Sequence, residues 1–234
     1  GEGLYWRYEL ALRRLESAAG VLAVGSGPIM AVRREILSLL DPDESEDLAL
    51  PLRVLLAGKR NVYVPEAVSG ELLYQDRALP MYRSRVRIVS KDLRTLLRHA
   101  RVLDPRRRAL AAVGLLSHKL LRWSIGFVLL GLLAASALEA PRNDAVAAFL
   151  AFQIAGHALA AWGSLAEKGV PAPRIATTAF FFDLLNAAAM HGILRALAGR
   201  RSGSWNPVRH DASARKPDLP AASRSGARLR SEDE

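Results

Sequence analysis

Two adjacent carboxylates, Glu46 and Asp47, follow the acidic stretch 41–45 and begin a predicted helix. Ser45 stands at the N-cap position, and the positive end of a helix favours an ionised carboxylate in the first turn. Asp47 should therefore be charged at neutral pH and able to accept a proton from a hydroxyl group, which is the task of a general base. Acidic residues also occur at helix starts for the dipole alone, so the pair by itself does not establish catalysis.

Two arginines and one aromatic side chain supply further groups that could bind a substrate. Arg85 and Arg87 stand two residues apart in a strongly basic segment, and guanidinium groups hold diphosphates through paired hydrogen bonds. Trp6 has a flat apolar face on which a sugar ring could stack. Each also has a structural interpretation: a solvated or lipid-facing charge run for the arginines, and a core aromatic for Trp6.

The composition indicates a membrane protein with an aqueous part. The chain has 234 residues, half of them apolar, and its charged and apolar residues are segregated. Its net charge of +10 comes from 33 basic and 23 acidic residues. Many cations flank apolar segments, which favours anionic membrane lipids over nucleic acid as the partner. The chain contains no cysteine, so disulfides and thiolate metal sites are excluded, and its histidines lack metal-ligand spacing.

Residues 1–80 are predicted to form a partial α/β domain. Apolar residues recur at helical spacing over 3–19, and a second helix is expected from Glu46 to about Ala57. A short helix is expected over 34–40. Three short apolar runs favour β-strands, at 21–25, 29–33 and 61–65. Strands that alternate with helices are typical of a layered α/β fold.

Residues 81–200 are predicted to form long helices of two kinds. In 81–108 apolar residues occupy one helical face and cations the other, which predicts a basic amphipathic helix in the headgroup layer. The alternative is that this helix packs on the aqueous domain. Residues 109–200 contain three segments long enough to cross a bilayer, at about 116–138, 145–165 and 175–197. Residues 201–234 are expected to be a basic, disordered tail.

The charge distribution predicts the topology. Segment 77–108 holds eleven basic and two acidic residues, a net charge of +9. The positive-inside rule therefore places it, together with residues 1–80, in the cytoplasm of a multi-pass protein of the cell (inner) membrane. We expect three crossings, with the polar face of the third segment buried against the others. That leaves the tail outside, although Arg200 and Arg201 favour the inside, and the alternative is a tilted or interfacial third segment.

Several short motifs occur in order along residues 1–209, and together they resemble the C-terminal half of membrane-embedded family 2 glycosyltransferases, the group that includes cellulose, chitin and hyaluronan synthases. They are Gly3-Leu4-Tyr5-Trp6-Arg7-Tyr8-Glu9, Gly25-Ser26-Gly27-Pro28 with Ala31-Val32-Arg33-Arg34, Glu46-Asp47, Val62-Tyr63-Val64-Pro65-Glu66-Ala67, Ser84-Arg85-Val86-Arg87-Ile88, His118-Lys119-Leu120-Leu121-Arg122-Trp123 and Trp205-Asn206-Pro207.

The resemblance implies the C-terminal half of a GT-A-like nucleotide-sugar transferase domain, an inverting reaction, and Asp47 as the catalytic base. It places Glu46, Arg85, Arg87 and Trp6 at the substrates, which would be a nucleotide-sugar donor and a lipid or saccharide acceptor beside membrane lipids. The family's Asp-x-Asp metal site would lie before Gly1, so the Mg or Mn ion of the complete enzyme would not be held by this chain.

Ser84 and Ile88 stand where processive members carry Gln and Trp, which puts processive polymer synthesis in question. The chain begins within what looks like a domain, so we expect it to be a fragment. Two other interpretations remain open: a non-catalytic remnant or membrane-anchoring subunit, and a small membrane transporter or scaffold.

Overall fold

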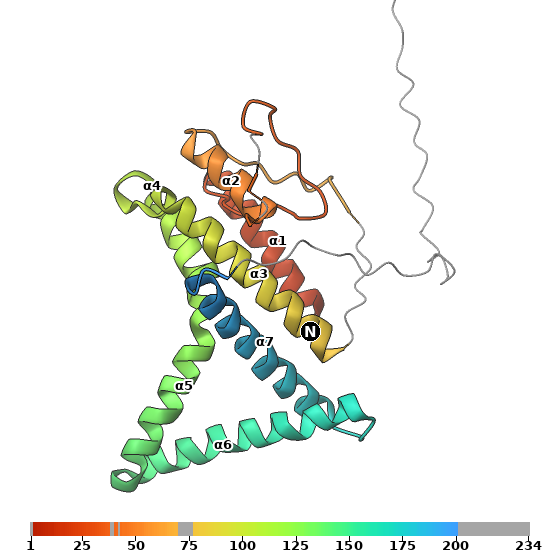
Figure 1. Cartoon of the computed structure of the whole chain (residues 1–234), viewed down its shortest axis with the longest axis vertical. Coiled ribbons are helices and arrows are strands. Elements are labelled where there is room, and N and C mark those ends of the chain that lie inside the picture. The colour runs from red at the N-terminus through yellow and green to blue at the C-terminus, as the bar shows by residue number, and fades with distance from the viewer. Residues whose placement is uncertain (1, 38–39, 42, 70–76, 201–234) are drawn as a thin grey trace, which may run out of the picture. The chain divides into compact units, whose positions relative to one another are not determined.

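The computed structural model describes residues 2–37, 40–41, 43–69 and 77–200, with backbone alone for 2–6 (Figure 1). The predicted tail, with its Trp205-Asn206-Pro207 motif, lies outside the described residues. Seven α-helices occur in the described part: α1 Glu2–Ala18, α2 Glu46–Leu56, α3 Ala78–Arg98, α4 Pro105–Leu115, α5 Arg122–Glu139, α6 Asp144–Ser164 and α7 Arg174–Leu197. Short 3-10 turns at Ala100–Leu103, Ala140–Arg142 and Leu165–Lys168 and a π-helical segment at Leu116–Leu121 connect them.

The prediction of an α/β fold was wrong, because the described residues contain helices and no β-strand. The runs 21–25, 29–33 and 61–65 are not strands, and the predicted helix at 34–40 is only a turn at 34–36 where it is described. A strand requires a neighbouring strand for its backbone groups. Here other partners serve: the amide of Asn61 donates to the carbonyl of Leu22 at 2.7 Å, and the backbone N–H of Tyr63 donates to the Ser17 hydroxyl at 2.8 Å.

The helices of the N-terminal part occur where the spacing predicted them. Helix α1 ends two residues before Gly20, which has a φ of +70°, a conformation that favours glycine. Helix α2 begins after Ser45, as expected for an N-cap, and continues through Pro51. Its buried leucines Leu48, Leu52 and Leu55 recur at helical spacing and form a core with Leu96 of α3 and with α4.

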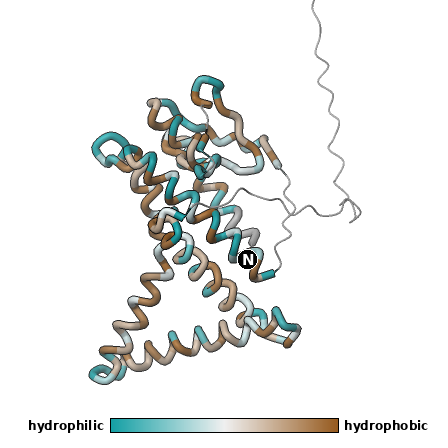
Figure 2. The backbone as a smooth tube through the Cα atoms, viewed as in Figure 1, coloured by the Kyte–Doolittle hydropathy of each residue, from teal (hydrophilic) through white to brown (hydrophobic). Residues whose placement is uncertain are grey.

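Helix α3 connects two hydrophobic cores. Leu96 belongs to the core built on α2, whereas Val89 and Leu93 pack with Trp123 of α5 and Ala189 of α7. Most of the apolar stripe that predicted a lipid-facing helix is buried against protein, namely Val86, Val89, Leu93 and Leu96, whereas Leu97 is 56% exposed. The basic helix thus packs on α2 through one core and on α5 and α7 through the other. Figure 2 shows teal, hydrophilic positions along the same helix.

Three helical stretches are long and apolar enough to cross a membrane: Pro105–Arg142, Asp144–Lys168 and Arg174–Leu197. They contain the three predicted spans, so the prediction of a membrane protein is confirmed at this level. Polar side chains join them in pairs: Gln153 donates to the Ser136 hydroxyl at 2.9 Å, and His157 Nδ1 lies 2.8 Å from the Asp183 carboxylate. Such pairs satisfy polar groups that lipid cannot hydrogen-bond.

Candidate functional site

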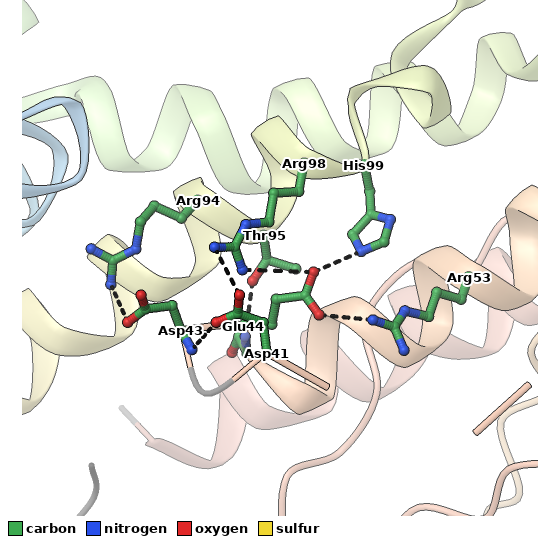
Figure 3. A network of polar contacts seen from close by, with 9 residues as sticks. Asp41, Asp43, Glu44, Arg53, Arg94, Thr95, Arg98 and His99 are labelled. Carbon is green, nitrogen blue, oxygen red and sulfur yellow. Dashed lines mark hydrogen bonds and ion pairs between the residues drawn. The ribbon is translucent and has the colours of Figure 1, made fainter. Parts of the chain in front are cut away.

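A network of ion pairs holds the acidic loop that precedes α2 (Figure 3). Glu44 is only 6% exposed, and a buried carboxylate is costly unless it is paired. Its two oxygens meet Arg53 Nη2 of α2 at 2.8 Å and His99 Nε2 at 3.2 Å. Glu44 therefore joins α2 to the end of α3.

Two arginines of α3 extend this network along the loop. Arg98 lies 3.2 Å from the Asp41 carboxylate, and Arg94 lies 3.9 Å from that of Asp43. The Asp43 backbone N–H also donates to Asp41 Oδ1 at 2.8 Å, which closes a tight turn. The loop is thus attached to the C-terminal half of the basic helix, as Figure 3 shows.

Ser45 links this network to the candidate base. Its backbone N–H donates to the fully buried hydroxyl of Thr95 at 2.8 Å, and its own hydroxyl donates to Asp47 Oδ1 at 2.6 Å. Ser45 occupies the N-cap position, but its side chain caps no backbone amide, because its hydroxyl donates its hydrogen bond to the Asp47 carboxylate. Asp47 is half-buried and Glu46 is exposed. The Ser45 hydroxyl therefore restrains the carboxylate of Asp47, a residue that is only half-buried.

Gly25 contacts the same residue through its backbone. Its N–H donates to the carbonyl oxygen of Asp47 at 2.7 Å. A Cβ at Gly25 would lie 3.3 Å from that oxygen and 2.6 Å from Met30 Sδ. The glycine of the Gly25-Ser26-Gly27 motif thus allows the segment 21–25 to approach the first turn of α2.

The other predicted site residues lie elsewhere. Arg85 and Arg87 are on α3, ten and eight residues before Thr95, which is about 15 and 12 Å along the helix axis at 1.5 Å per residue. They are half-buried, and the contacts with the acidic loop come from Arg94 and Arg98 instead. Trp6 lies in α1, and its side chain falls outside the described part.

Sequence reasoning did not identify Thr95, Arg94, Arg98, His99 or Arg53 as neighbours of the acidic loop. One signal was available, because the acidic residues of 41–47 face a complementary basic stretch at 94–101. Charge complementarity alone does not choose among the many other arginines of this chain, and the choice required the packing of α2 on α3.

An apolar groove of about 280 Å³ lies between α1 and the stretch formed by α4 and the π-helical segment. Leu12, Leu15, Leu110 and Val113 are among its lining residues. Glu16 is at its side, and burial raises the pKa of this carboxyl above its usual value, an effect that His118 partly opposes. Because α4 begins the first membrane-length stretch, the groove continues the apolar surface of that stretch.

The described residues include no group of three or more His, Asp or Glu side chains suited to hold a metal ion. Comparison with protein-family models, with characterised proteins and with solved structures found no match to the chain. The site must therefore be interpreted from its own geometry and motifs.

Proposed function

We propose that this chain is the membrane-anchored, acceptor-side part of an inverting glycosyltransferase. In the complete enzyme the Asp47 carboxylate accepts the proton of an acceptor hydroxyl. The hydroxyl oxygen bonds to the anomeric carbon of a nucleotide sugar, and the bond from that carbon to the diphosphate oxygen breaks with its electron pair. The nucleoside diphosphate leaves. The Asp-x-Asp metal site and the other nucleotide-binding residues would belong to a part of the enzyme outside this sequence.

The observation that carries the proposal is the carboxylate of the half-buried Asp47, which is restrained by a hydrogen bond from Ser45. A general base must stay ionised, keep one orientation and remain within reach of the hydroxyl. Asp47 lies in the first turn of α2, and the Ser45 hydroxyl, which donates to its carboxylate at 2.6 Å, restricts the side chain. The ordered family 2 motifs, with Glu46-Asp47 among them, connect this carboxylate with glycosyl transfer.

The ion-pair network supports the same proposal. The loop before α2 is tied to α3 by Glu44, Asp43 and Asp41, so its motion relative to the base is restricted. Precise placement of reacting groups can lower the activation free energy by several kcal/mol, roughly the amount that measured effective molarities imply. Arg85 and Arg87 remain our candidates for the leaving diphosphate.

The test uses the enzyme in its complete reading frame, purified in detergent or nanodiscs. Asp47→Asn should lower release of nucleoside diphosphate from a panel of nucleotide sugars by about two to four orders of magnitude. Glu35→Gln, which removes an exposed carboxylate outside this loop, is the control for loss of a charge, and Ser45→Ala should give an intermediate loss.

All three variants must show the thermal melting temperature of the parent within a degree or two, so that loss of activity is not loss of folding. Transfer by Asp47→Asn at a rate near that of the parent would remove Asp47 as the base. If the complete reading frame released no diphosphate from any donor, the chain would instead be a non-catalytic anchoring subunit.

A further inference from the structure

Helices α3 and α7 lie side by side and run in the same direction (Figure 1). Gly192 of α7 packs directly on α3, since a Cβ there would lie 2.9 Å from both the Val86 carbonyl oxygen and Val89 Cβ. The Tyr82 hydroxyl lies 3.0 Å from His191 Nδ1. Farther along both helices, Arg94 Nη1 donates to the carbonyl of Arg200. Because the residue numbers rise together in these contacts, the helices are parallel in direction.

Both ends of α7 are tied to α3. The turn that precedes α7 contributes Glu167, whose carboxylate accepts a hydrogen bond from the backbone N–H of Ala78 at 3.1 Å. Ala78 is the first residue of α3. At the other end, Arg200 follows α7 and contacts Arg94. The start and the exit of α7 therefore both lie against one helix.

Helix α3 cannot be embedded in the hydrocarbon layer of the membrane. It carries six cations in 21 residues, Arg83, Arg85, Arg87, Lys91, Arg94 and Arg98. Each such charge costs about 2.5–3.5 kcal/mol at the centre of a bilayer even on the mildest scale. Its C-terminal half is also bound to the acidic loop before α2 through Arg94 and Arg98. Helix α3 must therefore stay at the aqueous surface of the membrane.

We propose that α7 lies along the membrane surface beside α3 and does not cross the bilayer. The crossing part is then the hairpin of α5 and α6, and the chain after Arg200 returns to the side that carries Asp47. The partner of α7 is the headgroup and acyl boundary of one leaflet. The exposed apolar side chains that contact it are Ile175, Phe182, Leu194 and Leu197.

Two further properties of α7 agree with this placement. It is the least apolar of the three membrane-length helices, and its last turn carries Arg195. The return of the chain to the cytoplasmic side also places Arg195, Arg200 and Arg201 where the positive-inside rule expects them. The length of α7, 24 residues, would permit a crossing, so length alone does not decide. The inference does not depend on glycosyl transfer.

Depth measurements on the full chain test the proposal. The chain has no native cysteine, so single cysteines at Ile175, Phe182 and Leu194 can carry spin labels in vesicles of phosphatidylcholine and phosphatidylglycerol. A crossing helix would separate the labels at Ile175 and Leu194 by about 28 Å in depth, at 1.5 Å per residue. We expect all three labels at one shallow depth, within about 5 Å, as for a helix in the interface.

Labels at Phe127 and Leu138 of α5 are the matched controls, and their depths should differ by about 16 Å along a crossing helix. All five positions are exposed, so substitution should leave the packing intact. A label at Phe182 near the bilayer centre, with Ile175 and Leu194 at opposite faces, would overturn the proposal.

Thiol accessibility gives a second readout. A cysteine at Ser204 should react with an impermeant reagent from the same side as a cysteine at Glu66, in the part that carries Asp47. The cysteine at Ser204 should not react when the reagent is on the side of the membrane from which a cysteine at Arg142 is labelled. Arg142 lies in the connection between α5 and α6. Reaction of Ser204 together with Arg142 would show that α7 crosses, and would by itself refute the surface placement.

Discussion

The backbone N–H of Gly25 donates a hydrogen bond to the carbonyl oxygen of Asp47 at 2.7 Å. In a regular helix this oxygen would accept from the amide four residues later, but that residue is Pro51, which has no N–H. Gly25 therefore replaces the missing helical donor. The contact explains how α2 continues through a proline, and it fixes the first turn, where the candidate base lies, to the segment 21–25.

Gly25→Ala should disturb this contact. The new Cβ would lie 3.3 Å from the Asp47 carbonyl and 2.6 Å from Met30 Sδ, so the segment must shift. We expect a loss of about 1–3 kcal/mol in the free energy of unfolding, as for other overpacked sites. Gly27→Ala is the matched control, because nothing lies within 4 Å of a Cβ there. Denaturant unfolding in detergent would measure both, and equal stabilities for the two variants would contradict this account of Gly25.

Glu44→Gln should destabilise the protein by several kcal/mol. It removes the ion pair between Glu44 and the mostly buried Arg53, and loss of one member of a buried pair typically costs about 3–5 kcal/mol. We expect a loss in the free energy of unfolding at or below the lower end of that range, because the Arg53 side chain is 19% exposed to solvent. Glu35→Gln, which removes an exposed ion pair with Lys59, should change stability by less than about 1 kcal/mol. Comparable unfolding midpoints for both variants would argue that the Glu44 network has no structural role.

Asp92 and Lys119 form an ion pair that joins α3 to the π-helical segment before α5. Asp92 is 1% exposed, and its carboxylate lies 2.7 Å from Lys119 Nζ. Lys119→Met should leave a buried charge without its partner and lower the melting temperature strongly, whereas the double variant Asp92→Asn with Lys119→Met should recover much of the loss. A double-mutant cycle on thermal melting measures this coupling. Additive effects would mean that the two side chains do not interact.

Glu16 should make the stability depend on pH. Burial raises the pKa of this carboxyl in the folded protein, so the folded state binds the proton more tightly than the unfolded chain. Stability from this group is therefore present below its unfolded pKa and is lost as the pH rises through the folded pKa. The melting temperature of the parent should fall relative to Glu16→Gln as the pH rises from about 4 through that window. Parallel pH profiles for the two proteins would show that Glu16 has an ordinary pKa.

Much of the helical structure followed from local patterns. The apolar spacing of 3–19, the acidic start at Glu46, and the long apolar segments after His118 each predicted a helix that the structure contains. These signals are local, because helical hydrogen bonds join residues four apart and the membrane requirement is a matter of length and composition. The candidate base, Asp47, was likewise identified from its position at a helix start.

The errors concern features that need a distant partner. The runs at 21–25 and 61–65 have strand-like composition, but a strand exists only where another strand pairs with it, and here Asn61, Ser17 and the carbonyl of Asp47 supply or receive the hydrogen bonds. The burial of Val89 and Leu93 of the basic helix against α5 and α7 likewise depends on helices far along the chain.

The sequence by itself determined where most helices lie, that three of them are membrane-length, and which carboxylate begins α2. The tertiary structure alone decided that Thr95, Arg94 and Arg98 hold the loop before Asp47, and that α7 lies parallel to α3. The physical reason is that charge and apolarity are properties of single residues, whereas the choice among many arginines and several apolar faces depends on how helices far apart in the chain pack together.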